Sequence, residues 1–248
     1  MQPNNKKFGL IGRNISYSFS KKYFNEKFSQ ELLEDYTYDN FDIPFIEEFP
    51  NILKNNPNLK GLNVTIPYKE AIIPYLDTLS EKAYNIGAVN VIRFTKKGNL
   101  KGYNSDWYGF KKKLEPLLQT HHRKALILGT GGAAKAVAYA LKELGIFYAN
   151  VSRESKENTI NYNQINSATF DEYQIIINCT PLGTSPNIME FPPIPYDFFT
   201  NKHIAFDLIY NPEETLFLNK AKSNGAVVVN GKDMLIFQAE KAWKIWNK

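Results

Sequence analysis

The sequence predicts an α/β protein of two domains, each built around a largely parallel sheet. Short apolar segments of strand character alternate with helical periods along the chain, which is typical of layered α/β folds. A length of 248 residues favours two compact domains over one. At residues 124–136 an apolar strand runs directly into a glycine-rich turn and a helix, which predicts a Rossmann-type second domain.

In the first half of the chain, strands are expected at 8–11, 36–38, 59–64 and 88–94. Helical periods between them lie at about 20–33, 44–54 and 67–75. The Lys-Lys-Gly-Asn turn at 96–99 joins 89–93 to 100–103 and predicts a hairpin. A helix over about 106–118 follows, with Asp106 as its candidate N-cap.

The polar stretch 119–124 is expected to mark a boundary before the alternation of strands and helices restarts. Further strands are expected near 125–128, 148–152, 175–178, 204–208 and 227–229. The last helix has a broad apolar face, so it is expected to pack back on the first domain with Gln238 facing a ligand cleft. The two domains are therefore expected over 1–105 plus 232–248 and over 106–231.

Composition and charge argue against several classes of partner. The chain is 43% hydrophobic and 22% charged, and no apolar run is long enough to span a bilayer, so no membrane partner is expected. The net charge of +5 favours anionic small ligands, but the basic residues are scattered, so nucleic acid is not expected. The first residues lack an apolar signal core and the single Cys179 cannot form an internal disulfide, which favours a cytoplasmic location.

The glycine-rich turn has the form Gly-x-Gly-x-x-Ala and sits between a strand and a helix, as a dinucleotide fingerprint requires. Gly129 permits the tight turn, and Gly131 lets the backbone approach a pyrophosphate. The N–H groups that open the helix then hold the negative charge. The alternatives are a purely structural turn and a Rossmann-like methyltransferase.

The end of the next strand indicates the type of cofactor. NAD sites usually have an acidic residue there, whereas this chain has Ser152 and Arg153, which are suited to the 2′-phosphate of NADP. Glu154 complicates this interpretation, because a carboxylate repels that phosphate unless it points away. NADP is expected in preference to NAD.

Lys69 ends the segment Asn-Val-Thr-Ile-Pro-Tyr-Lys at 63–69, just past a tight apolar turn. A lysine held there is able to donate a proton, although most lysines are solvated surface residues. The Asn-Ser-Asp segment at 104–106 is a second polar candidate. Together with the glycine turn, these segments predict an enzyme.

Eight ordered segments resemble the shikimate dehydrogenase family. Two are Gly-Arg-Asn-Ile-Ser-Tyr-Ser-Phe-Ser at 12–20 and the segment at 63–69, and the other six lie at 87–90, 102–106, 129–133, 178–183, 207–212 and 231–239. The resemblance implies reversible, NADPH-dependent reduction of 3-dehydroshikimate to shikimate, a step towards the aromatic amino acids. It implies that the first domain binds the substrate and the second binds NADP, without a metal, in a monomer or homodimer.

The resemblance also implies roles for single residues. Ketone reduction needs a proton at the oxygen, and Lys69 matches its donor, oriented by Asp106. Ser18 and Ser20 match a carboxylate clamp, and their spacing places them on one face if the segment is extended. The other implied substrate residues are Thr65, Asn90, Asn104, Tyr210 and Gln238. The implied cofactor residues are Gly129, Thr130, Gly131, Gly132, Ala133, Ser152, Arg153, Thr180, Leu208 and Gly231.

Several of these roles have structural alternatives. Buried polar residues often only satisfy backbone groups, and Tyr210 is equally suited to a core position. The chain also departs from the family pattern at Asn14, Tyr17, Lys21, Phe24, Lys232 and Asp233. Two rival functions are a quinate-oxidising paralogue and a silent NADP-binding regulator. The regulator should have lost Lys69 or Asp106, and both are present.

Overall fold

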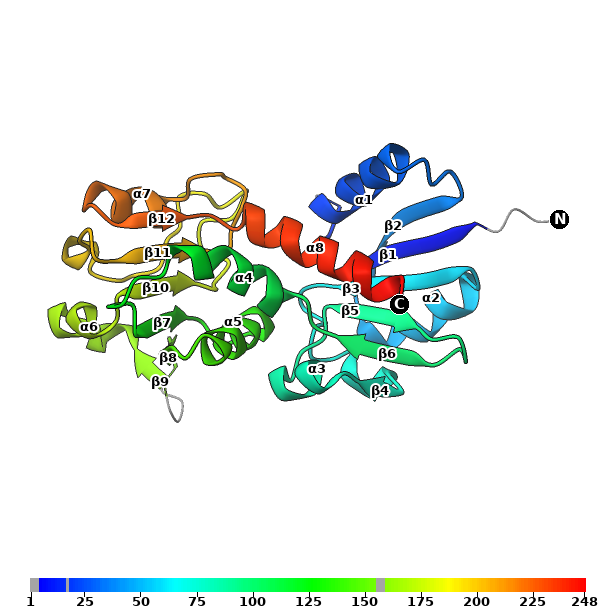
Figure 1. Cartoon of the computed structure of the whole chain (residues 1–248), viewed down its shortest axis with the longest axis horizontal. Coiled ribbons are helices and arrows are strands. Elements are labelled where there is room, and N and C mark those ends of the chain that lie inside the picture. Colours follow the sequence, from blue (N-terminus) through cyan, green and yellow to red (C-terminus); the bar gives the residue numbers. More distant parts are fainter. Residues whose placement is uncertain (1–4, 17, 155–158) are drawn as a thin grey trace. The chain divides into compact units, whose positions relative to one another are not determined.

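The computed structural model describes residues 5–16, 18–154 and 159–248. The chain divides into two compact units, Met1–Ser105 with Ala239–Lys248 and Asp106–Gln238 (Figure 1). The described residues of each unit form one six-stranded sheet. None of the helices in these described stretches combines the length and the apolar character that a membrane span needs.

The sheet of the first unit has the strand order β2-β1-β3-β5-β6-β4. Neighbouring strands are parallel except at the pairs β3–β5 and β5–β6, and the latter pair confirms the predicted hairpin. The strands are β1 (Lys6–Gly12), β2 (Tyr36–Asp42), β3 (Leu59–Val64), β4 (Thr78–Leu79), β5 (Val91–Phe94) and β6 (Leu100–Tyr103).

The helices of the first unit differ from the prediction at two places, the helix expected over 67–75 and α3, which was not expected. They are α1 (Phe19–Gln30), the 3₁₀ helix η1 (Ile46–Glu48), α2 (Phe49–Asn55), the 3₁₀ helix η2 (Ile73–Tyr75) and α3 (Glu81–Ile86). The helix expected over 67–75 is wrong, because turns precede η2 there. Pro74 has no N–H for an α-helical bond, and Tyr68 is fixed instead by donating its hydroxyl to Ile43 O at 2.7 Å.

An aromatic cluster fills the side of this unit where α1 lies. Phe8, Phe24, Phe28 and Tyr38 pack with the last residues of α8 (Lys232–Trp246), of which Trp246 donates its Nε1–H to Ile92 O at 3.0 Å. A side chain at Gly61 would collide with the Trp246 ring. The second half of α8 is therefore part of the core of the first unit.

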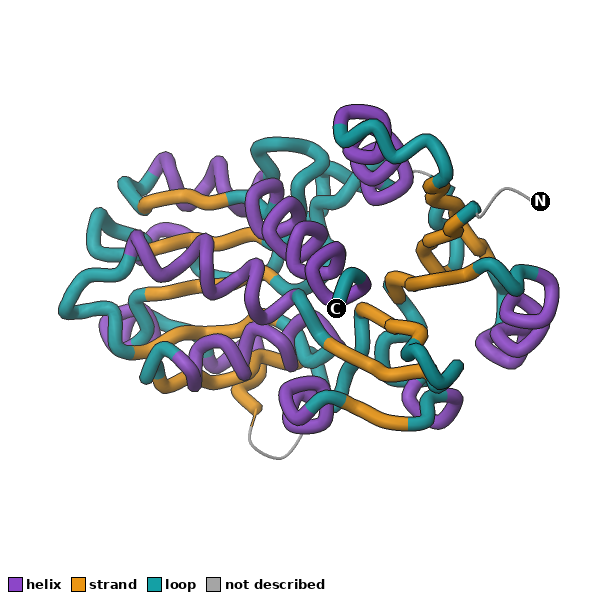
Figure 2. The backbone as a smooth tube through the Cα atoms, turned by 45° about the vertical axis from the view of Figure 1, so that its right-hand side comes forward, coloured by secondary structure: helices purple, strands orange, loops and turns teal. Residues whose placement is uncertain are grey.

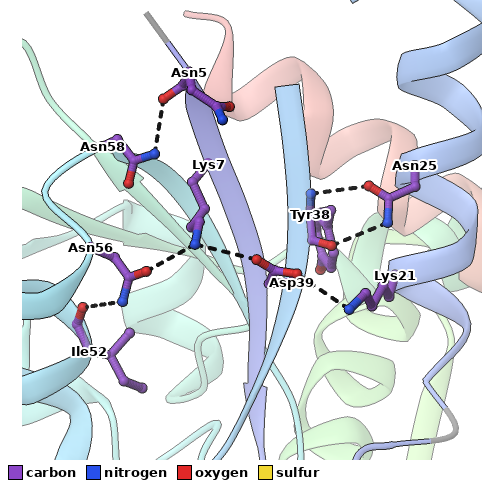
Figure 3. Close-up of polar contacts among 9 residues, drawn as sticks. All are labelled: Asn5, Lys7, Lys21, Asn25, Tyr38, Asp39, Ile52, Asn56 and Asn58. Atoms are coloured by element: carbon purple, nitrogen blue, oxygen red, sulfur yellow. Dashed lines mark hydrogen bonds and ion pairs between the residues drawn. The ribbon is translucent and has the colours of Figure 1, made fainter. Parts of the chain in front are cut away.

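Polar side chains fix the edge of this sheet (Figure 3). Asn25 of α1 bonds both backbone groups of Tyr38, accepting from its N–H at 3.1 Å and donating to its carbonyl at 3.2 Å. On the same strand, Asp39 pairs with Lys7 at 3.4 Å and with Lys21 at 3.3 Å. Because β2 is an edge strand, the two Asn25 bonds satisfy backbone groups that would otherwise lack a neighbouring strand.

The second sheet is entirely parallel and has the order β12-β11-β10-β7-β8-β9 (Figure 1). Figure 2 draws its strands in orange between purple helices. Taken from β9, this is the doubly wound order 3-2-1-4-5-6, and it confirms the predicted Rossmann-type fold. The order reverses between β7 and β10. The strands are β7 (Lys124–Leu128), β8 (Phe147–Ser152), β9 (Thr159–Asn161), β10 (Ile175–Asn178), β11 (Ile204–Asp207) and β12 (Val227–Val229).

Helices cover both faces of this sheet. On one face Phe170 and Phe217, from α6 and α7, pack on Leu126 and Ile176. On the other, Phe110 of α4 packs on Phe206 at 4.8 Å. The helices with 3₁₀ segments are α4 (Asp106–Leu114), η3 (Glu115–Leu117), α5 (Gly132–Glu143), η4 (Tyr162–Gln164), α6 (Ser167–Glu172), η5 (Tyr196–Phe198) and α7 (Leu216–Ser223).

Two expectations near the start of this unit are wrong. The polar stretch 119–124 is not a boundary, because α4 before it already packs on the second sheet. Asp106 is the first residue of α4 rather than the residue before it, so it is not the N-cap. The break between the units lies at 105/106, and it falls again within α8, at 238/239.

Candidate active site

Four segments of the first unit converge on one edge of its sheet. β1 and β3 are parallel and end there, since Ile11 pairs with Val64. β5 begins at the same edge and β6 ends there, since Val91 pairs with both Asn63 and Tyr103. The described residues that continue from these strand ends are 13–16, 18, 65–69, 88–90 and 104–105. They carry Ser18, Thr65, Asn90 and Asn104 of the predicted substrate residues, together with Lys69, whereas Ser20 lies in α1.

Backbone hydrogen bonds hold these segments together. Val89 N donates to Lys69 O at 2.7 Å, which fixes the backbone of Lys69 beside the residues that precede β5. Asn90 N donates to Tyr103 O at 3.1 Å, and the Asn104 amide donates to Ala88 O at 2.9 Å. Asn90 and Asn104 are buried, whereas the side chains of Thr65 and Lys69 are half-buried. The structure therefore brings Thr65, Lys69, Asn90 and Asn104 to one edge.

The two predicted clamp serines are arranged differently from expectation. The chain is extended at Ser18 but already helical at Ser20, because Ser18 is the N-cap of α1 and accepts from Ser20 N at 3.2 Å. The N-cap role uses only an oxygen lone pair, so the Ser18 hydroxyl proton is not consumed by it. Ser20 is buried and forms a side-chain hydrogen bond with Tyr38.

Tyr38 begins a buried chain of hydrogen bonds across the unit. Its hydroxyl donates to Asn63 Oδ1 at 2.8 Å, and the Asn63 amide donates to Asn90 O at 3.1 Å. Asn90 in turn donates to Ser105 Oγ at 3.0 Å and accepts from Ser105 N at 2.7 Å. Burial raises the pKa of Tyr38 well above its usual value, and the Ser20 bond opposes this. This series of hydrogen bonds links Ser20 to Asn90 through Tyr38 and Asn63, which have no predicted site role.

The departures from the family pattern near the serines have local explanations. Asn14 has a φ of 56°, which Asn tolerates, and its N–H donates to Asp42 Oδ1 at 2.8 Å. Lys21 pairs with Asp39. Phe24 is fully buried and stacks on Tyr38 with ring centroids 4.8 Å apart. Tyr17 lies outside the described residues.

Three further predicted residues belong to the second unit, namely Asp106, Tyr210 and Gln238. Asp106 directly follows Ser105, is buried, and opens α4. Gln238 is buried in α8 and donates to Leu235 O at 3.0 Å. Tyr210 follows β11 and is half-buried, so it is not a core aromatic.

The predicted dinucleotide turn has the geometry that a phosphate needs. Gly129 has a φ of 115°, a conformation that other residues rarely adopt, and Asn150 donates to its carbonyl at 2.9 Å. Gly131 has an ordinary φ of −76°, but no atom lies within 4 Å of where its Cβ would be. A strained φ therefore does not explain the glycine at 131. The open space beside its backbone is consistent with the close approach of a pyrophosphate.

The start of α5 supports the same interpretation. Gly131 is the N-cap of this helix and makes no side-chain cap, and no acidic residue occupies the first turn. The N–H groups of Gly132 and Ala133 stand at the positive end of the helix, while Thr130 is exposed beside them. These residues fit the pyrophosphate of a dinucleotide.

The end of β8 carries the predicted 2′-phosphate residues. Ser152 is buried and its Oγ accepts from Glu154 N at 3.2 Å, while Arg153 is exposed. Burial raises the pKa of Tyr162 to about 12, and the Arg153 charge partly opposes this. The guanidinium is thus an exposed positive charge near Tyr162, next to the turn that fits the pyrophosphate.

The loops after β10 and β11 carry Thr180 and Leu208. Thr180 donates its hydroxyl to Asn178 Oδ1 at 2.6 Å, and Leu208 N donates to Asn178 O at 3.1 Å. Gly231 N donates to Ile209 O at 2.9 Å, and a side chain at Gly231 would collide with Leu208 O. Thr180 and Leu208 are therefore held through Asn178, and Gly231 is held against the backbone of Leu208 and Ile209.

Three buried residues that sequence reasoning missed organise the candidate residues of the two units, each within its own unit. Tyr38 connects the substrate-side residues, and Asn178 and Asp207 connect the loops of the second sheet. One signal was present: Asn178 and Asp207 are polar residues that end two neighbouring apolar strands, where ligands of parallel sheets bind. Asp233, for which the sequence offered no role, pairs with Lys113 at 2.6 Å.

Comparison with known proteins identifies the family. Residues 10–92 match the family model described as the shikimate dehydrogenase substrate binding domain. The chain is 39% identical to a shikimate dehydrogenase (NADP(+)) of Clostridium botulinum, over 96% of this chain and 95% of that protein.

Solved structures agree with this match. The shikimate dehydrogenase of Aquifex aeolicus superposes with a TM-score of 0.87 at 33% identity, covering 100% of this chain and 94% of the other. The Thermus thermophilus enzyme, solved in complex with NADP(H) and shikimate, has a TM-score of 0.85 at 31% identity, with coverages of 97% and 93%. This chain belongs to the shikimate dehydrogenase family.

Proposed function

We propose that this chain catalyses the reversible reduction of 3-dehydroshikimate to shikimate with NADPH. The observation that carries the proposal is the 39% identity, along almost the whole chain, to a protein named shikimate dehydrogenase (NADP(+)). The candidate residues of each unit are consistent with that chemistry. We further propose that it acts in the cytoplasm, as a monomer or homodimer.

The first unit, with residues up to 105 and the end of α8, supplies the substrate site. Ser18, whose hydroxyl proton is not used in capping α1, and Ser20 bind the substrate carboxylate. Thr65, Asn90 and Asn104 bind ring hydroxyls, each as a neutral group that both donates and accepts. Tyr210 and Gln238 complete the set of substrate-binding residues.

Lys69 donates the proton that the carbonyl oxygen needs as the ketone is reduced. This role is supported by the bond from Val89 N, which fixes the Lys69 backbone beside the segment of Asn90, and by the half-buried Lys69 side chain. Asp106 orients Lys69 and a substrate hydroxyl. In the reverse direction Lys69 accepts the proton from the hydroxyl that is oxidised.

The second unit binds NADP. Gly129 to Ala133 hold the pyrophosphate, and Ser152 with Arg153 bind the 2′-phosphate. Thr180, Leu208 and Gly231 bind the nicotinamide half, whose ring supplies the hydride when NADPH is bound. The backbone N–H of Glu154 donates to Ser152 Oγ, which supports the turn that carries Ser152 and Arg153. The Glu154 carboxylate has no proposed contact with the phosphate.

A spectrophotometric assay of nicotinamide reduction tests the proposal and separates it from its nearest rival. Shikimate and quinate are each supplied with NADP⁺ and with NAD⁺. We expect the highest kcat/KM with shikimate and NADP⁺. Higher kcat/KM with quinate would favour the quinate-oxidising paralogue, and absence of turnover with all four pairs would refute both.

A further inference from the structure

Asp207, the last residue of β11, is fully buried, yet donors from three separate segments converge on its carboxylate. Oδ1 accepts from the Asn178 amide at 3.1 Å and from Ile209 N at 3.0 Å, and Oδ2 accepts from Thr215 Oγ1 at 2.6 Å. These donors come from the end of β10, the loop after β11 and the start of α7. One carboxylate therefore ties three chain segments together.

Two of these three bonds, those from Asn178 and Ile209, continue to residues with a proposed ligand role. Asn178 uses its other atom, Oδ1, to accept from both the N–H and the hydroxyl of Thr180, at 3.0 and 2.6 Å. Ile209 lies between Leu208 and Tyr210, and its carbonyl accepts from Gly231 N. Asp207 itself is buried below these loops, so it acts through them.

The strand order separates these loops from the phosphate-binding turn. The turn and Arg153 follow β7 and β8, on one side of the point where the order reverses, whereas Thr180 and Leu208 follow β10 and β11 on the other. Each half of a doubly wound sheet binds one mononucleotide of a dinucleotide. The loops tied by Asp207 therefore belong to the nicotinamide half.

We propose that Asp207 is a positioning residue for the nicotinamide half of NADP, acting through Asn178 on Thr180 and through Ile209 N on the Leu208–Tyr210 loop. This inference rests on the proposed function. A buried carboxylate is a poor source of stability compared with an apolar residue of similar size. The three donors of Asp207 instead hold the loops after β10 and β11 in one arrangement. These loops lie beyond the strand ends, so no neighbouring strand orders them.

Ligand binding, measured by calorimetry, tests this role without relying on turnover. Asp207→Asn keeps the size of the side chain but replaces one acceptor oxygen with a donor. The probes are NADP⁺ and adenosine 2′,5′-bisphosphate, which has the phosphorylated adenosine half but no nicotinamide. We expect the Kd of NADP⁺ to rise about tenfold in the variant, as for the loss of one hydrogen bond to a charged group, with the Kd of the adenosine probe unchanged.

The control is Asp171→Asn, which removes an exposed carboxylate of α6 in the same unit and should change neither Kd. If Asp207→Asn does not fold, Thr215→Val removes the donor to Oδ2 together with the N-cap bond from Leu218 N, and it should show the same selective loss. Equal weakening of both probes, or no change in either, would overturn the role of Asp207. A wild-type chain that binds neither probe would instead refute the proposed NADP site.

Discussion

Replacing Tyr38 with Phe removes one buried hydroxyl and leaves its packing in place. The ring stacks on Phe24 and lies in the aromatic cluster, and Phe preserves both contacts. The lost hydroxyl is the donor to Asn63 Oδ1 at 2.8 Å and the partner of Ser20. The change therefore isolates the hydrogen-bond chain from the core that surrounds it.

The expected cost follows from what is left behind. An ordinary hydrogen bond contributes about 0.5–1.5 kcal/mol net, but a buried polar atom left without a partner costs about 1–3 kcal/mol. Asn63 Oδ1 is such an atom, since Asn63 is only 5% exposed. We expect Tyr38→Phe to lower the free energy of unfolding by about 1–3 kcal/mol. Because Asn63 also bonds Asn90 O, the KM for shikimate should rise while that for NADP⁺ stays constant.

Urea unfolding followed by circular dichroism measures the stability change, and initial rates measure both KM values. The control is Tyr36→Phe on the same strand, where the hydroxyl accepts from Lys6 Nζ at 2.7 Å in a partly buried contact. It should change stability by less than about 0.5 kcal/mol. If Tyr38→Phe is as stable as the wild type and has an unchanged shikimate KM, the hydrogen-bond chain does not support the substrate residues.

Three further changes test other parts of the account. Gly129→Ala places a side chain at a φ of 115°, so we expect about 1–3 kcal/mol lower stability by urea unfolding and weaker NADP⁺ binding by calorimetry; unchanged values would refute the role of this turn. Arg153→Ala should reduce the preference for NADP⁺ over NAD⁺ in kcat/KM by about tenfold or more, and an unchanged preference would place the 2′-phosphate elsewhere. Burial and the charges of His121 and His203 lower the pKa of His122, against the opposing bond to Lys202 O, so the unfolded chain binds a proton there more readily. The stabilising effect is complete above the unfolded pKa of about 6.5 and is lost as the pH falls through the folded pKa, so His122→Asn should flatten acid unfolding, whereas an unchanged pH profile would contradict this assignment.

The sequence predicted elements well where a local pattern dominates. The strands at 59–64, 175–178 and 227–229 have the expected bounds, and the last two are short, mainly apolar runs. β4 and β9 were missed, since two or three residues are too few to show alternation. The helix expected over 67–75 does not form, although its apolar residues have helical spacing, because Pro74 has no N–H to donate within an α-helix.

The candidate site shows the same limit. Lys69, Asn90 and Arg153 were found from motifs that are contiguous in the chain. Tyr38 and Asp207 were missed as site residues, because their roles depend on partners such as Asn63, 25 positions away, and Asn178, 29 positions away. Hydrogen bonds between distant segments have no periodicity for a sequence to display.

The most direct test of the central claim compares the wild type with Lys69→Ala in the oxidation of shikimate by NADP⁺. The account predicts rapid turnover by the wild type. It predicts a kcat lower by about 10²–10⁴-fold in the variant, with a nearly unchanged KM for shikimate, because only the proton transfer is lost. A variant that keeps near-normal kcat would contradict the account, since the group that transfers the proton would then lie elsewhere.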